Sequence, residues 1–245
     1  MDIGSQTHVA DLATQYPATI RVFQRHSIDF CCGGKRPLGE VCAEQGLSLA
    51  DLKQDLEGAL SAAPSPVRRE TSLEGLVGHI VERYHRPLDE ELPRLDQMLQ
   101  KVLRVHGERH PELAQVAAAF GEIKDDLGPH MMKEERVLFP YIVRLETIAS
   151  SGEALLGSPF GSVQSPIGAM EAEHEAVGRA LASLRERTAG FEAPADACNT
   201  FRGLYHGLAD LERELHEHIH IENNILFPGA LRLEAKLLEA TRAER

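Results

Sequence analysis

One sequence unit occurs twice in this chain and limits the fold more than any other feature. Residues 130–140 read HMMKEERVLFP and residues 218–228 read HIHIENNILFP, so both follow the pattern H-x3-E-x3-L-F-P with an offset of 88 residues. A second pair, His85 and His174, is separated by 89 residues, and apolar residues follow each histidine at +3, +7 and +10. The repeat indicates two helical hairpins of one design.

Helical periodicity dominates the chain from Ser72 onward, with breaks near residues 107–111, 150–166 and 190–194. No Val/Ile/Thr-rich alternating segment bounded by turns occurs. The predicted fold class is therefore all-α, an antiparallel up-down four-helix bundle. We expect its helices over 72–106, 111–148, 166–189 and 195–227, with a polar tail after Pro228.

The first 60 residues differ in character from the rest. Short helical patterns flank an irregular centre, DFCCGGKRPLGEVC, rich in Gly and Cys, whereas residues 61–70, SAAPSPVRRE, have linker composition. We expect three parts: a small helical Cys-containing domain over 1–60, a linker over 61–70, and the four-helix bundle over 71–245.

The repeated unit places its polar residues inside the bundle. A His and a Glu four residues apart share one helix face, and here that face continues the apolar stripe. With hairpin turns near residues 108 and 196, all four repeat-related histidines lie 22 or 23 residues from a turn, which is one level of the bundle. The predicted layer consists of His85, His130, Glu134, His174, His218 and Glu222.

Two buried carboxylates beside four imidazoles imply a compensating cation. Nitrogen and carboxylate donors from four helices are typical of di-iron or di-manganese sites rather than of Cys-rich structural zinc. We expect two non-haem iron ions that could share an oxide bridge, with Glu134 and Glu222 bridging and the histidines as terminal ligands. Such a site leaves positions open for nitric oxide or oxygen.

The long domain resembles the hemerythrin-like di-iron bundles. With CCGG at 31–34 in a separate module, the whole chain is similar to the repair of iron centres family. This resemblance implies repair of iron-sulfur clusters after nitrosative or oxidative damage, by donation of labile iron to iron-sulfur client proteins. Oxygen-carrying hemerythrins add a fifth His in an H-x3-H pair, but Gly178 stands at +4 from His174. Two alternatives stay open: a nitric oxide reductase or scavenger, and an oxygen or redox sensor.

The cysteines carry a second hypothesis. Cys31 and Cys32 are adjacent and therefore pair poorly with each other, which leaves a small buried role, thiol or metal transfer, or a mixed disulfide. Lys35 and Arg36 should lower a nearby thiol pKa and favour the reactive form. Cys42 could add a third thiol, whereas a structural role is expected for Cys198.

Several further residues are assigned from helical phase and rise. His106 lies 21 residues from His85, about 31 Å along a straight helix, so it cannot share the metal layer. Glu173, beside His174, could orient an imidazole. Pro129 should kink or restart the helix before His130. A surface position is expected for His79, His206, His216 and His220.

Charge and composition indicate which partners are disfavoured and which compartment is favoured. The chain of 245 residues has 26 Lys+Arg and 38 Asp+Glu, a net charge of −12, so binding to nucleic acid or to an anionic membrane is disfavoured. The absence of a long apolar run, of a signal-peptide pattern and of a disulfide framework favours a cytoplasmic protein. Monomer and homodimer are both compatible with the sequence.

Overall fold

The computed structural model describes residues 3–62, 72–155 and 157–243, and it divides the chain into two compact units. Unit 1 comprises residues 1–71 and 216–228, and unit 2 comprises residues 72–215 and 229–245. Helices account for all the regular structure of the described residues, since the only β-type pairing among them is an isolated bridge between His8 and Pro37. The all-α prediction is confirmed. Most of the expected linker, from residue 63 onward, lies outside the described residues, so the domain boundaries stay a prediction.

The N-terminal part of unit 1, over residues 3–62, contains four short helices and one 3-10 turn around a small apolar core. Phe23 and Phe30 stack in this core with ring centroids 6.3 Å apart, and Cys42 packs among the buried residues. Gly46 ends the third helix with a φ of 68°, a conformation that favours glycine. The elements are α1 (Val9–Gln15), η1 (Pro17–Thr19), α2 (Ile20–Arg25), α3 (Leu38–Gln45) and α4 (Leu49–Ala62).

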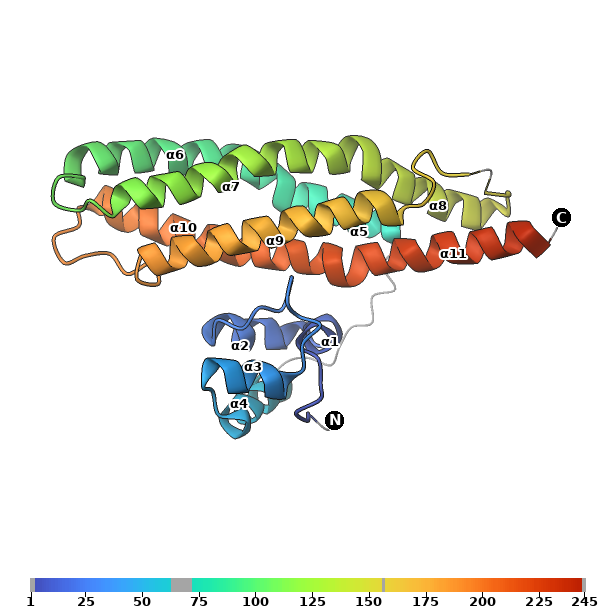
Figure 1. Cartoon of the computed structure of the whole chain (residues 1–245), viewed down its shortest axis with the longest axis horizontal. Coiled ribbons are helices and arrows are strands. Elements are labelled where there is room, and N and C mark those ends of the chain that lie inside the picture. The colour runs from blue at the N-terminus through green and yellow to red at the C-terminus, as the bar shows by residue number, and fades with distance from the viewer. Residues whose placement is uncertain (1–2, 63–71, 156, 244–245) are drawn as a thin grey trace. The chain divides into compact units, whose positions relative to one another are not determined.

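Four long helical rods run side by side in Figure 1, and short loops join the first to the second and the third to the fourth. The Ser72 side chain caps the first rod by accepting a hydrogen bond from the Gly75 amide at 3.0 Å. No helix among the described residues is long and apolar enough to cross a membrane. The rods are α5 (Leu73–Ile80)–η2 (Val81–His85)–α6 (Arg86–His106), α7 (Leu113–Lys133)–η3 (Glu134–Leu138)–α8 (Phe139–Ser151), α9 (Gln164–Arg187), and α10 (Asn199–Ile221)–η4 (Glu222–Leu226)–α11 (Phe227–Ala243).

Three of the four rods contain a π-helical segment, which sequence periodicity did not predict. In each, buried residues recur at three successive intervals of four, a span of 12 residues. At ~100° per residue an α-helix would rotate the last of them ~120° away from the first, and one extra residue in a π turn removes most of that rotation. The buried series are Ile80, Tyr84, Leu88, Leu92; His130, Glu134, Leu138, Ile142; and His218, Glu222, Leu226, Ala230.

A proline follows every π segment by two residues: Pro87, Pro140 and Pro228. Proline has no N–H to bond the carbonyl four residues back, and its ring crowds that carbonyl, so a wider turn there costs less than it would elsewhere. The predicted tail after Pro228 was therefore wrong, because the helix continues as α11 to Ala243. Pro129 also differs from expectation: α7 runs through it uninterrupted, and the residue is exposed, so water can bond the freed carbonyl.

Candidate metal centre

The π segments carry the candidate ligands at their ends. His85 is the last residue of η2, while Glu134 and Glu222 are the first residues of η3 and η4. His130 and His218 lie one turn earlier, in the last turns of α7 and α10. None of the six predicted residues, which include His174 on α9, is more than 2% exposed. The widened turns thus occur where the sequence predicted the metal layer, as π turns often do at functional sites.

The six residues form two groups of donors that could each hold a metal ion. One group contains His85 and His218, and the other contains His130 and His174. Both groups include Glu134 and Glu222, and the donor atoms within each group lie within 4.8 Å of one another. Two carboxylates are therefore common to two pairs of imidazoles.

Individual distances show how closely the donors converge. The Glu134 Oε2 atom is 3.5 Å from His85 Nε2 and 3.4 Å from His130 Nε2. The Nε2 atoms of His130 and His174 are 3.0 Å apart. On the last rod, His218 Nε2 lies 3.0 Å from Glu222 Oε1. The Nε2 atoms therefore face the shared carboxylates.

Two carboxylates outside the donor layer contact the Nδ1 atoms of two of its imidazoles. Glu135 Oε1 lies 3.0 Å from His85 Nδ1, and Glu173 Oε2 lies 2.8 Å from His130 Nδ1. A carboxylate at Nδ1 fixes the ring and directs Nε2 toward a metal. Glu173 was expected to be able to orient an imidazole, and the imidazole that it contacts is that of His130 on another helix. Glu135 was missed, although its position beside Glu134 in the sequence was a signal.

Basic residues complete these outer contacts. Arg86 donates to Glu135 at 3.3 Å, and Lys133 bonds Glu173. Burial opposes ionisation of Glu173, but hydrogen bonds from Lys133 and His130 outweigh it and lower the pKa of this carboxyl. Each of these two carboxylates therefore contacts both an imidazole and a basic side chain.

The donor set fits a transition-metal cation. Fully buried carboxylates cost much free energy unless positive charge accompanies them, and Glu134 and Glu222 are both 0% exposed. Imidazole nitrogens and carboxylate oxygens are the ligands that non-haem iron takes in helical bundles. The residues present thus match a cation in type, burial and convergence.

The cysteine pair has a different chemistry from that expected. Cys31 is buried, and the pKa of its thiol is raised well above its usual value, first by the hydrogen bond to Cys32 and then by burial. Arg36 does not lower it, because its guanidinium pairs with Glu40 and Glu44. The expectation of a lowered thiol pKa at Cys31 was therefore wrong.

Asp29 joins the two thiols in a third group that could hold a metal ion. Its carboxylate accepts hydrogen bonds from the backbone N–H groups of Cys31, Cys32 and Gly33 at 2.8–3.0 Å. These bonds fold residues 31–33 into a turn around the aspartate. Cys42 is not part of this group, because it packs in the apolar core of unit 1.

Within unit 1, residues after His218 bond the backbone carbonyls of Phe30 and Cys31. His220 Nδ1 lies 3.2 Å from the Phe30 carbonyl oxygen, and Asn224 donates to the Cys31 carbonyl at 3.2 Å. His220 is only 2% exposed, and burial lowers its pKa to about 4. The predicted surface position of His220 was therefore wrong. His216 is only partly exposed, whereas His79 and His206 are exposed as expected.

Comparison with known proteins agrees with this geometry. The profile of the hemerythrin HHE cation binding domain matches residues 77–230, and a domain of unknown function (DUF542) matches residues 5–60. The iron-sulfur cluster repair protein YtfE of Pectobacterium carotovorum subsp. carotovorum (strain PC1) is 38% identical over 92% of this chain and 97% of its own length. The protein of the same name from Yersinia pseudotuberculosis serotype IB is 39% identical over 96% of this chain and 100% of its own length. The chain belongs to the hemerythrin HHE family.

Proposed function

We propose that this protein holds two iron ions in the buried donor layer and supplies iron to damaged iron-sulfur clusters of cytoplasmic client proteins. The observation that carries the proposal is the pair of buried donor groups that share Glu134 and Glu222. The relatives named iron-sulfur cluster repair protein YtfE support the same process.

Each donor group supplies one ion with two imidazoles and access to both carboxylates. His85 and His218 would hold one iron, and His130 and His174 would hold the other. Glu134 and Glu222 would serve both ions, because each belongs to both donor groups. When bound, iron would supply transferable cargo and could take small ligands such as nitric oxide or oxygen.

The chain's own residues set how firmly the cargo is held. Glu135 and Glu173 orient His85 and His130, and their side chains are 27% and 37% exposed. Each of these carboxylates is therefore in contact both with a histidine of the donor layer and with solvent. A shift of either one would release an imidazole from its fixed orientation, which makes the site suitable for giving up metal.

The thiol group of unit 1 is the proposed exit for the cargo. Asp29, Cys31 and Cys32 offer one carboxylate and two sulfur donors. Because the Cys31 pKa is raised, metal must displace the thiol proton, so capture there is coupled to proton release.

The first test is Mössbauer spectroscopy on anaerobically purified iron-57 protein, with metal analysis of the same sample. We expect two spin-coupled iron ions per chain, lost as an apo-ferredoxin gains its cluster. Zinc alone, or no metal in a folded protein, would contradict the proposal. Rapid conversion of nitric oxide to nitrous oxide without iron transfer would replace it by the reductase alternative.

Removal of an outer carboxylate should weaken metal binding without removing a ligand. We expect Glu135→Ala and Glu173→Ala each to reduce iron affinity by about 10- to 100-fold, because the imidazole loses its fixed orientation. Competition with a chromogenic chelator measures the change. Glu175→Ala is the matched control, since Glu175 is exposed one residue from His174. Equal affinity in all three variants would show that Glu135 and Glu173 do not position ligands.

A further inference from the structure

Cys198 and His106 form a thiol–imidazole pair in unit 2, remote from the metal layer. His106 is the last residue of α6, and Cys198 directly precedes α10. The His106 Nε2 atom is 3.2 Å from the Cys198 sulfur. His106 is only 4% exposed, whereas Cys198 is exposed. Cys198 is therefore not the isolated structural residue that the sequence suggested.

The environment of His106 fixes which nitrogen carries its proton. An Arg109 Nη2 atom lies 3.4 Å from His106 Nδ1. A guanidinium can only donate, so Nδ1 accepts and the proton resides on Nε2. The ring also packs against Phe201 with centroids 5.3 Å apart, which holds the orientation. His106 thus donates its Nε2–H to the sulfur and does not act as a base toward it.

The start of α10 adds further donors to the same sulfur. Hydrogen bonds from the backbone N–H groups of Phe201 and Thr200 lower the pKa of the Cys198 thiol, although desolvation opposes them. Donors that converge on a sulfur stabilise its thiolate form. Two elements distant in sequence, α6 and α10, therefore favour the nucleophilic state of one exposed cysteine.

The other ionisable groups at this end are engaged with one another. His110 Nε2 lies 3.1 Å from Asp196 Oδ1, and His110 Nδ1 lies 3.0 Å from Glu112. Arg109 also pairs with Asp196 at 3.0 Å. Asp196 and Glu112 are thus each paired with a cationic or N–H partner at this end of the bundle.

We propose that Cys198 is a redox modification site that reacts with low-molecular-mass disulfides, and that His106 is its positioning residue. The Cys198 thiolate attacks one sulfur of the disulfide, a new S–S bond forms, and the old S–S bond breaks. The second sulfur leaves as a thiolate, so the cysteine is oxidised to a mixed disulfide while half of the reagent is reduced. A thiol returns Cys198 to its original state by the reverse exchange.

Two other cysteines, Cys31 and Cys42, are expected to react more slowly than Cys198. Cys31 and Cys42 are 4% and 3% exposed, and the pKa of each thiol is raised. Buried thiols with raised pKa values hold little thiolate at neutral pH and react slowly. His106, the partner of Cys198, lies 21 residues after His85, about 31 Å along the first rod, so modification of Cys198 occurs away from the donor layer.

The full-length protein is exposed briefly to glutathione disulfide, and mass spectrometry of its peptides quantifies modification at each cysteine from pH 5 to 9. We expect Cys198 to be modified before Cys31 and Cys42, with a midpoint below that of a free thiol. His106→Phe should slow the reaction at pH 7 by roughly three- to tenfold, because each unit of raised thiol pKa removes about 90% of the thiolate.

Two further variants separate the hydrogen bond from general structure. His106→Gln retains an N–H donor and should restore part of the rate, whereas His110→Phe changes a neighbouring ring that does not bond the sulfur and should leave it unchanged. Circular dichroism confirms that each variant is folded. Reaction at Cys198 no faster than at Cys42, or an identical pH profile in wild type and His106→Phe, would overturn the proposal.

Discussion

Replacing Glu134 with leucine is expected to lower the iron content from two ions per chain to at most one while the helices remain intact. Glu134 belongs to both donor groups and is fully buried, so its loss removes an oxygen ligand from each. Removing a ligand should weaken binding by more than the 10- to 100-fold typical of an outer partner, that is by more than about 100-fold. Metal analysis and chelator competition measure this loss.

Although Glu134→Leu should weaken iron binding, it should raise the free energy of unfolding of the metal-free protein. A buried carboxylate without its cation is costly, and leucine has a similar volume, so the metal-free Glu134→Leu variant should be about 1–4 kcal/mol more stable to urea. Glu175→Ala, on the exposed face of α9, should change neither the iron affinity nor the stability of the metal-free protein. A Glu134→Leu variant that still binds two iron ions tightly would refute the bridging role.

Helical geometry explains why so much of the donor layer was predictable. The burial of His85, His130 and His218 follows from their phase on apolar stripes, and their common level follows from a constant rise per residue. Both quantities are local properties of a helix, so sequence spacing is sufficient to predict them. The resemblance to hemerythrin-like bundles, which rested on the two H-x3-E-x3-L-F-P units, is likewise confirmed.

The errors arose where a helix departs from uniform geometry. A constant 3.6 residues per turn cannot represent η2, η3 or η4, so the buried intervals of four residues went unexplained. Proline was treated as a stop signal, yet Pro228 follows a widened turn and the helix continues beyond it. The combination of repeated four-residue intervals and a proline was the signal that could have predicted these segments.

Contacts between different helices were the least predictable. Glu173 bonds His130 on another rod, and Cys198 bonds His106 across 92 residues of sequence. The pKa of Cys31 depends on burial and on Cys32 more than on nearby basic residues in the sequence. Such pairings depend on how the rods pack, which one sequence does not specify.

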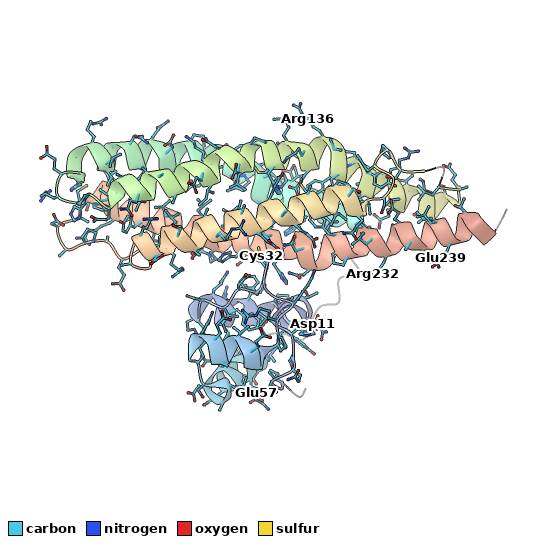
Figure 2. The ribbon with its side chains drawn as sticks, in the orientation of Figure 1. Asp11, Cys32, Glu57, Arg136, Arg232 and Glu239 are labelled. Carbon is cyan, nitrogen blue, oxygen red and sulfur yellow. The ribbon has the colours of Figure 1, made fainter. Side chains whose placement is uncertain are left out.

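Deletion of Val137 tests whether the widened turn of η3 serves metal binding. Val137 is 46% exposed, and its removal would convert the intervals after His130 from four, four and four to four, three and four. A regular α-helix accommodates that series, so the apolar face of α8 keeps its register. Its neighbour Arg136 projects away from the bundle in Figure 2. The deletion therefore shortens the helix on the side that faces solvent.

We expect the Val137 deletion to stay fully helical and to melt at least as high as the wild type without metal, while iron affinity falls by at least about tenfold. The reason is that Glu134 begins the π turn, so the deletion would move its carboxylate relative to the other donors. Metal–ligand distances tolerate changes of only ~0.2 Å. Val137→Ala keeps the chain length and should bind iron normally. If the deletion binds two iron ions as tightly as Val137→Ala does, the widened turn serves packing around Pro140 and not the metal layer.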